Sequence, residues 1–331
     1  MKVLHLGKKG NVEKHTRNET LLREIALVDL PIDTPIEEIV RLAGDAKYLI
    51  VDAIGKVSGE LIRQMLQLKM IHSEGVAYNQ IDVDAARENH VYVCNCKGMN
   101  ALAVAEQTLL LMLGLLRDVK GGDEAVRTGR QQAVKEAYMA AGNLYEIADF
   151  KVGLVGFGDI AKSVAGLLQV LGVETYYYAR HQAEPQVEEA YHVKYLPLKE
   201  LCRTCNMISL HIPVTPQTTN MFDASLFELM PEGSYFINTA RGEVVDSEAL
   251  IGAIQSGKIA KAGLDTIQGE PVQLDNPFLQ APKEVLERVL FSPHIGGITN
   301  TSFKRGYQMI WEDILKMERD SKPDHIVNDW M

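Results

Sequence analysis

The sequence predicts an α/β protein with two doubly wound parallel sheets. Three observations support this fold class. The chain has 331 residues, more than a single hydrophobic core usually accommodates. Short apolar runs alternate with helical segments over residues 1–95, and a second alternation starts at Lys151. A glycine-rich turn lies directly between a strand and a helix of the second alternation. Such alternation is typical of parallel strands covered by helices.

The first alternation contains five strand-like runs and three segments with helical spacing. Ser58 and Asp82 are plausible N-terminal caps of two of these helices. A long helix over Ala101–Val119 follows. The strands are expected at Val3–Leu6, Ala26–Leu30, Tyr48–Val51, Met70–His72 and Val91–Cys94, and the helices at Ile36–Leu42, Gly59–Leu66 and Val83–Glu88.

The second alternation contains six strand-like runs, each followed by a helix or a loop. Asp246 is expected to cap a helix that Gly257 closes. A last long helix is expected over Asn300–Arg319. The strand-like runs are KVGLV, VETYYY, MISLHI, GSYFIN, AKAGLD and VLFSP.

Charge and hydropathy exclude several functions. The net charge of −10, without a lysine or arginine cluster, opposes binding to nucleic acid. The N-terminus lacks the apolar core of a signal peptide. The apolar run Ala101–Leu116 is interrupted by Glu106, Gln107 and Thr108, so it is too short and too polar to span a bilayer. We expect a soluble, cytoplasmic protein with no membrane partner.

The four cysteines form two close pairs, Cys94/Cys96 and Cys202/Cys205. They could make a four-thiolate zinc site or a redox dithiol, or they could be unrelated buried thiols in a reducing cytosol. Neither pair lies in the tight knuckle that a zinc ribbon uses. Buried thiols are therefore expected, and no metal site.

A glycine-rich loop follows the apolar strand KVGLV and opens a helix. Gly156 permits a tight turn, and Gly158 lets the backbone approach a pyrophosphate at the helix N-terminus, where Asp159 and Ile160 lie. Ala161 stands where a third glycine often stands and is still small enough for close packing. The alternative is a structural turn in some other α/β protein.

The end of the next strand bears on the choice of dinucleotide. An NAD-specific domain usually places an acidic residue there to accept the ribose hydroxyls. Here the position holds Ala179, followed by Arg180 and His181. A guanidinium can bind a 2′-phosphate, which a carboxylate would repel. NADP is therefore favoured over NAD, unless Arg180 only stacks on adenine or points to solvent.

Three later strands each precede a chemically capable side chain. Arg241 follows Asn238-Thr239-Ala240, Glu270 lies in the segment Gly263–Pro271, and His294 follows Ser292-Pro293. The carboxyl ends of strands are where doubly wound sheets bind ligands. A fixed cation, a carboxylate and an imidazole together are what a 2-oxo acid reductase needs. Singly, each could instead be a surface ion pair or a core histidine.

These motifs together resemble the D-isomer-specific 2-hydroxyacid dehydrogenases, in particular glyoxylate and hydroxypyruvate reductases. The resemblance also includes Gly75–Asp82, Val104-Ala105-Glu106 and His211–Pro216, so it covers nearly the whole chain. It implies a Rossmann-type cofactor domain, residues 100–297, inserted into a flavodoxin-like substrate domain of residues 1–99 plus 298–331. The active site would then lie in the cleft between the domains.

By the same resemblance, Arg241 holds the substrate carboxylate and polarises the carbonyl oxygen. His294 exchanges the proton on that oxygen, and Glu270 orients the imidazole and favours its protonated form. The backbone N–H groups of Val76 and Ala77 complete the carboxylate site. The further cofactor-binding residues that it implies are His211, Pro213, Thr218, Thr239, Ala240, Asp265 and Gly297.

The sequence also departs from the family pattern. Ala77 and Asn79 replace a common glycine and aspartate, and Gln131-Gln132 lie where tryptophan is frequent. Neither departure involves Arg241, Glu270 or His294. Glu270 counts against formate oxidation, because formate-oxidising relatives carry glutamine there.

Acidic residues favour an unphosphorylated substrate such as glyoxylate or hydroxypyruvate. Asp52 and Glu74 lie where phosphoglycerate-oxidising members bring arginines, although both could be solvated rim charges. The alternatives are a D-3-phosphoglycerate dehydrogenase and a non-catalytic, dinucleotide-sensing binding protein. The resemblance further implies a homodimer through the Ala101–Val119 region.

Overall fold

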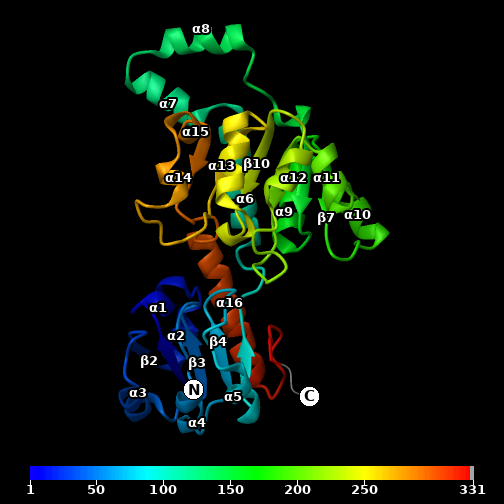
Figure 1. Ribbon diagram of the computed structural model, residues 1–331. Helices are drawn as coiled ribbons and strands as arrows, with labels where there is room; N and C mark the ends of the chain where they lie inside the picture. Colours follow the sequence, from blue (N-terminus) through cyan, green and yellow to red (C-terminus); the bar gives the residue numbers. More distant parts are fainter. Residues whose placement is uncertain (329–331) are drawn as a thin grey trace. The chain divides into compact units, whose positions relative to one another are not determined.

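The structure is a computed structural model that describes residues 1–328. The chain divides into two compact units, Met1–Asn100 with Ile298–Met331, and Ala101–Gly297. The last three residues of the expected substrate domain, 329–331, lie outside the described residues. Each unit is built around one parallel sheet (Figure 1).

The first unit contains a five-stranded parallel sheet in the order β2-β1-β3-β4-β5. This is the flavodoxin-like order, which the sequence analysis expected. Its strands are β1 (Lys2–Leu6), β2 (Ala26–Leu30), β3 (Tyr48–Val51), β4 (Met70–Ser73) and β5 (Tyr92–Cys94). Its helices are α1 (Asn11–His15), α2 (Glu19–Glu24), α3 (Ile36–Ala43), α4 (Gly59–Gln64), α5 (Val83–Glu88) and α16 (Asn300–Met317).

The second unit contains a seven-stranded parallel sheet in the order β12-β11-β10-β9-β6-β7-β8. Read from β8, this is the Rossmann order with one further strand. Its strands are β6 (Lys151–Val155), β7 (Glu174–Tyr178), β8 (Val193–Tyr195), β9 (Met207–Leu210), β10 (Ser234–Asn238), β11 (Ile259–Leu264) and β12 (Val289–Phe291). The predicted fold class, two doubly wound parallel sheets, is confirmed.

The helices of the second unit are more numerous than the sequence analysis predicted. They are α6 (Ala101–Leu116), α7 (Val119–Arg127), α8 (Gln131–Ala141), α9 (Asp159–Val170), α10 (Pro185–Tyr191), α11 (Leu198–Thr204), α12 (Ala224–Leu229), α13 (Ser247–Ser256), α14 (Pro277–Gln280) and α15 (Lys283–Leu286). Single turns of 3₁₀ helix lie at Ile147–Asp149 and Gly242–Val244.

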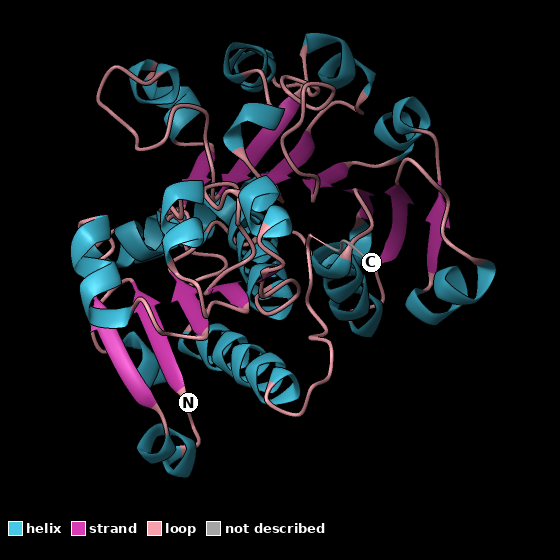
Figure 2. Cartoon of the chain, turned by 90° about the horizontal axis from the view of Figure 1, so that it is seen from below, coloured by secondary structure: helices cyan, strands magenta, loops and turns pink. Residues whose placement is uncertain are grey.

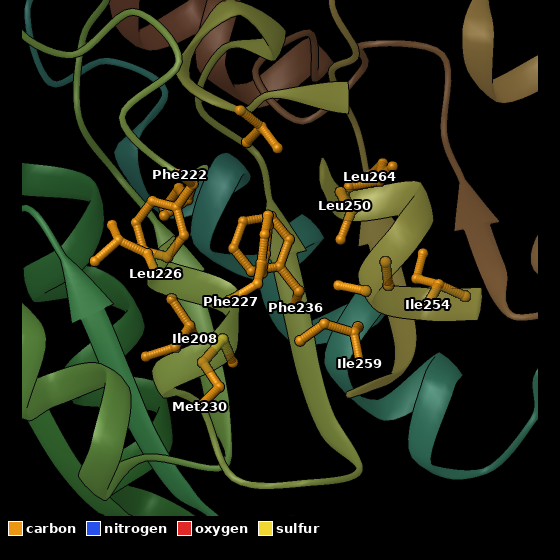
Figure 3. Close-up of a cluster of buried hydrophobic side chains, with 14 of the residues drawn as sticks. Ile208, Phe222, Leu226, Phe227, Met230, Phe236, Leu250, Ile254, Ile259 and Leu264 are labelled. Atoms are coloured by element: carbon orange, nitrogen blue, oxygen red, sulfur yellow. The ribbon is translucent and has the colours of Figure 1, made fainter. Parts of the chain in front are cut away.

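Helices cover both faces of each sheet (Figure 2). Alternate residues of a strand point to opposite faces, so each buried strand contributes to two apolar clusters. In β10, Phe236 belongs to the cluster beneath α12 and α13, whereas Tyr235 and Ile237 belong to the cluster beneath α6 and α9. Figure 3 shows the first of these, in which Phe222, Phe227 and Phe236 lie together.

The predicted helix caps are confirmed. The side chains of Ser58, Asp82 and Asp246 each accept a backbone hydrogen bond from the first turn of their helix. Gly257 closes α13 with φ of 85°, in the left-handed region that glycine adopts without a steric penalty.

The prediction of one long helix over Ala101–Val119 is wrong at its C-terminal end. The helix stops at Leu116, and Asp118 adopts a left-handed φ of 46° before α7 begins at Val119. Helices α7 and α8, which the sequence analysis did not predict, project together from the rest of the second unit (Figure 1).

Candidate active site

The glycine loop lies between β6 and α9, as predicted. Gly156 has φ of 98°, and a Cβ atom there would overlap the carbonyl oxygen of His211. Only glycine fits such a position. Gly158 differs, because a Cβ there would meet nothing within 4 Å. The space beside Gly158 and the first N–H groups of α9, from Asp159 and Ile160 onward, form a cradle that fits a pyrophosphate.

Arg180 and His181 follow β7 and are exposed, whereas Ala179 is half-buried. Within residues 1–328 the guanidinium of Arg180 makes no ion pair. The end of β7 is tied to the glycine loop, because the N–H of Gly156 donates to the carbonyl of Tyr178 at 2.8 Å. A cation therefore lies next to Ala179, at whose position an NAD-specific domain would place an acidic residue.

His211 lies just after β9 with its ring withdrawn from solvent. Its Nε2 is 3.0 Å from Ser209 Oγ, and its buried Nδ1 has no hydrogen-bond partner among the described residues. Burial lowers the pKa of His211 to about 3, so the ring is neutral at neutral pH. The hydroxyl of Thr218 donates to the carbonyl of Pro213 at 2.7 Å and thereby shapes the exposed loop.

Arg241 lies in a turn that the Asn238 side chain holds. That amide donates to the carbonyl of Arg241 at 2.9 Å and accepts from the N–H of Ala240 at 3.0 Å. The guanidinium is exposed, and its one described hydrogen bond goes to the carbonyl of Ala240. Thr239 is buried, and its hydroxyl contacts that of Thr108 on α6 at 2.9 Å. Arg241 thus presents a fixed cation at the end of β10.

The turn after Arg241 lies directly against the loop that carries Glu270. A Cβ on Gly242 would overlap the backbone of Ile267 and Gln268, so glycine is required for this approach. The N–H of Ile267 in turn donates to Glu270 Oε1 at 3.0 Å. The close approach of Gly242 to Ile267 and Gln268 therefore holds the turn after Arg241 against the loop that carries Glu270.

Glu270 and His294 form an ion-pair contact at the surface of the second unit. Glu270 Oε2 is 2.5 Å from His294 Nδ1, with 29% and 43% of the two side chains exposed. Because the carboxylate engages Nδ1, the other ring nitrogen, Nε2, is left to exchange a proton. It has no partner among the described residues. This arrangement suits a general acid–base.

Hydrogen bonds to Asp265 hold the turn that carries His294. The Asp265 carboxylate is buried, with 3% of the residue exposed, and accepts from the N–H groups of Ile295 and Gly296 at 3.0 and 2.9 Å. Its own carbonyl accepts from the N–H of His294 at 2.9 Å. The side chain thus holds the turn Ser292–Gly296, which keeps His294 at a left-handed φ of 55°. Gly297, half-buried, ends this turn.

The sequence analysis missed two supporting residues. Ser292 donates to Asp265, and Gln107 of α6 donates to the Ser292 hydroxyl at 2.9 Å. The available signal was the polar interruption Glu106-Gln107-Thr108 in an otherwise apolar helix. Two of these three residues, Gln107 and Thr108, contact the ends of β12 and β10.

The loop after β4 in the first unit carries the expected carboxylate-binding residues. Val76 and Ala77 are exposed, and among residues 1–328 neither backbone N–H donates a hydrogen bond. Ser73 donates to the carbonyl of Ala77 at 2.6 Å, and Asn95 donates to that of Val76 at 2.7 Å. The carbonyls are thus tied inward while the N–H groups remain available to an anion.

Glu74 is not the solvated rim charge that the sequence analysis allowed. It is 6% exposed, and it contacts His5 Nε2 at 2.9 Å and accepts from the hydroxyl of Tyr307. Asp29 engages the other nitrogen of His5 at 2.6 Å. Glu74 therefore belongs to a buried network, and only Asp52 of the two acidic residues lies near the surface.

The two cysteine pairs lie in different units and all four thiols are buried and unpaired. Burial raises the pKa of Cys202 and of Cys205 to about 12, and raises those of Cys94 and Cys96 as well. Thiols held in the protonated form are poor nucleophiles and poor redox partners. These contacts favour the buried-thiol interpretation.

The strand order, the glycine loop and the His294–Glu270 pair define a dinucleotide-binding α/β oxidoreductase. The family model described as "D-isomer specific 2-hydroxyacid dehydrogenase, NAD binding domain" matches residues 109–296. Dehydrogenase efuE of Hormonema carpetanum is 33% identical over 263 residues, which cover 79% of this chain and 63% of that relative. The chain thus spans less than two thirds of that relative's length.

Two further similarities extend over almost the whole chain. Glyoxylate reductase of Thermococcus litoralis is 30% identical over 306 residues, which cover 92% of this chain and 90% of that protein. The NAD-complexed D-isomer specific 2-hydroxyacid dehydrogenase of Lactobacillus delbrueckii matches 99% of this chain and 100% of its own, with 25% identity and a TM-score of 0.84.

The chain belongs to the family of D-isomer specific 2-hydroxyacid dehydrogenases, and it is an NAD(P)-dependent oxidoreductase of 2-hydroxy or 2-oxo acids. The resemblance inferred from the sequence is confirmed. Among residues 1–328, no helix is long and apolar enough to cross a membrane.

Proposed function

We propose that the protein reduces a small, unphosphorylated 2-oxo acid, such as glyoxylate or hydroxypyruvate, to the corresponding 2-hydroxy acid, which is the D isomer where that acid is chiral. NADPH is favoured over NADH. The observation that carries this proposal is the contact between Glu270 and His294 Nδ1, which leaves Nε2 available at the end of a strand. Arg241 supplies a nearby cation from a neighbouring strand end, fixed by Asn238.

Each catalytic residue has one role in the proposed reaction. Arg241 binds the substrate carboxylate and polarises the carbonyl oxygen. His294 donates its Nε2 proton to that oxygen during reduction and removes it in the reverse direction, and Glu270 stabilises the imidazolium form. In the first unit, the N–H groups of Val76 and Ala77, from which no described residue accepts, are the proposed donors to a carboxylate. The bound nicotinamide supplies the hydride to the carbonyl carbon.

The cofactor residues divide into binding and supporting groups. The N–H groups at Gly158, Asp159 and Ile160 bind the pyrophosphate, and Arg180 with His181 binds the 2′-phosphate. Asp265, Thr218 and Thr239 act through their hydrogen bonds to neighbouring segments, as positioning residues. The walls of the nicotinamide site come from His211, Pro213, Ala240 and Gly297.

An unphosphorylated substrate is supported by Asp52, at the loop after β3, whose carboxylate accepts from the N–H of Ile54 at 3.1 Å. A phosphate beside a carboxylate is disfavoured. The similarity to glyoxylate reductase of Thermococcus litoralis, over 90% of that protein, points to the same substrate class.

A homodimer is supported by apolar residues left exposed on α6, α7 and α8. Leu110 on α6 is 60% exposed, Val126 on α7 60% and Met139 on α8 75%. Helix α8 has no buried residue, although amphipathic helices usually depend on tertiary packing for stability. A second copy of the chain would cover these helices. The unpaired cysteines are compatible with the cytoplasm as the compartment.

The test is a panel that crosses NADH and NADPH with glyoxylate, hydroxypyruvate, pyruvate, bulkier 2-oxo acids and phosphohydroxypyruvate, followed by absorbance of the reduced nicotinamide. We expect the highest kcat/KM with NADPH and an unphosphorylated acid. Preference for phosphohydroxypyruvate would make the protein a phosphoglycerate dehydrogenase. Coenzyme binding without turnover on any acid would favour a dinucleotide-sensing binding protein.

A further inference from the structure

A second cluster of chemically capable side chains lies in the first unit, on residues that the proposed reaction does not use. His72 comes from β4, Asp313 from α16, and His325 from the segment after α16. His72 Nε2 is 3.3 Å from Asp313 Oδ2, and His325 Nδ1 is 2.9 Å from the same oxygen. The three ligand atoms lie within 4.8 Å of one another.

The hydrogen bonds of His72 leave its Nε2 facing an acceptor. His72 Nδ1 lies 2.9 Å from the carbonyl of Ser73, which can only accept, so Nδ1 carries the proton. In the neutral ring, Nε2 then holds a lone pair that faces another acceptor, the Asp313 carboxylate. Nε2 is buried and has no partner in hydrogen-bond geometry among the described residues. Two lone pairs that face each other in a dry site repel unless a proton or a metal ion lies between them.

The distances and the surrounding hydrogen bonds suit a transition metal. Bonds of about 2.0–2.1 Å from zinc to imidazole nitrogen and carboxylate oxygen place tetrahedral ligands about 3.3 Å apart. The donated Nδ1–H of His72 orients the ring, as it does for most metal-bound histidines. The second oxygen of Asp313 accepts from the N–H of Asp324 at 2.8 Å, so this ligand is oriented as well.

We propose that His72, Asp313 and His325 bind a divalent transition-metal ion, Zn²⁺ by ligand chemistry, which fastens the C-terminal segment to the sheet of the first unit. Two imidazoles and one carboxylate form a ligand set that suits zinc, with a fourth position for water. His72 and Asp313 are fully buried, whereas 25% of the His325 side chain is exposed and provides the route of entry.

The metal would reinforce contacts that already hold this segment. The N–H of Asn95 donates to the carbonyl of His325 at 3.1 Å, and the N–H of Val327 donates to that of Val93 at 2.8 Å. His72 also lies directly before Ser73, which holds the Val76–Ala77 loop. The site therefore joins β4 to two C-terminal residues that lie more than 200 positions further along the chain, which explains why no spacing motif predicted it.

The test uses full-length protein stripped with a chelator and then dialysed against Zn²⁺ or Co²⁺. Metal per chain is measured by elemental mass spectrometry, and affinity by competition with a chromophoric chelator. We expect wild-type protein to bind one ion that raises its thermal midpoint. His325→Ala should weaken this binding by about 100-fold or more, since even loss of an outer-shell partner costs about 10–100-fold.

Two further variants make the result decisive. Asp313→Asn preserves the shape of the side chain but supplies a poor ligand, so it should also lose the metal. His294→Asn removes a histidine–carboxylate contact of the second unit and should retain metal binding and the Co²⁺ visible spectrum. The proposal fails if His325→Ala and Asp313→Asn bind metal as wild type does, or if wild-type protein binds none. None of these measurements depends on turnover.

Discussion

His294 is the residue on which the proposed chemistry depends most directly. Because its φ is 55°, replacement by alanine would also strain the backbone, whereas asparagine tolerates the left-handed region better. We therefore predict that His294→Asn lowers kcat by about 10²–10⁴-fold, the usual contribution of a general acid–base. Fluorescence titration should show nearly unchanged coenzyme binding. Turnover close to that of wild type would show that another group supplies the proton.

Arg180 carries the proposed coenzyme preference. A charge-assisted hydrogen bond contributes about 1.5–3 kcal/mol, so Arg180→Ala should raise the KM for NADPH by about tenfold or more. The KM for NADH should change little. Arg203→Ala, which removes another exposed arginine of the same unit, is the matched control. Equal effects of Arg180→Ala on both coenzymes would mean that Arg180 stacks on the adenine.

At the residue scale, the sequence indicated candidate catalytic residues, which stay a prediction, but not the residues that position them. Arg241, Glu270 and His294 stand out because each follows a strand, and their order matches one family. The residues that position them act through hydrogen bonds that form only in the folded chain. These residues are Asn238, Gln107 and Ser292. Glu74 shows that the location of a charged residue can also be misjudged from the sequence. Its charge suggests a surface role, but its position beside His5 places it in the core.

At the scale of elements, the glycine loop permits a matched pair of variants. Gly156→Ala should destabilise the protein by about 1–3 kcal/mol, because φ is 98° and the new Cβ would overlap the His211 backbone. Gly158→Ala should leave the thermal midpoint unchanged, since nothing lies within 4 Å. It should still raise the coenzyme KM by about tenfold, because the methyl group occupies the space a pyrophosphate needs. A Gly158→Ala protein with normal coenzyme affinity would contradict this placement.

The elements that the sequence predicted are those with strong local signals. Buried strands and capped helices such as α13 carry their pattern in a few consecutive residues. Helices α1 and α2, of five and six residues, were missed, whereas α4 and α5, of six residues each, were predicted together with their caps Ser58 and Asp82. Helices α7 and α8 were also missed. Helix α8 buries none of its residues, so packing within the second unit does not explain its apolar side chains.

The buried network around His5 predicts how the stability of the chain depends on pH. Burial alone would lower the pKa of His5, but its hydrogen bonds with Glu74 and Asp29 raise that pKa overall. A raised folded-state pKa contributes stability below the unfolded value, and this contribution is lost as pH rises through the folded value. The difference in thermal midpoint between wild type and His5→Gln should therefore be larger at about pH 6 than at about pH 9. An equal difference at both pH values would show that His5 stays neutral.

At the scale of the whole molecule, the order of strands in both sheets follows from the alternation of strands and helices along the chain. Parallel strands need crossover helices, and right-handed crossovers leave few arrangements. The sequence therefore predicted the fold class. It did not predict the cluster of His72, Asp313 and His325, because β4 and the C-terminal segment meet only once the first sheet is assembled.

The proposed homodimer is tested by placing charge on the exposed apolar helices. Met139, 75% exposed on α8, would be buried against a second copy, so Met139→Lys should shift the protein from the mass of two chains to that of one. Val170→Lys is the matched control, because Val170 is 85% exposed and lies at the end of α9, which is not one of the three helices proposed to face the second copy. Light scattering after gel filtration measures both variants. A Met139→Lys protein that retains the mass of two chains would place the interface elsewhere, whereas a monomeric wild-type protein would leave these helices without the partner proposed for them.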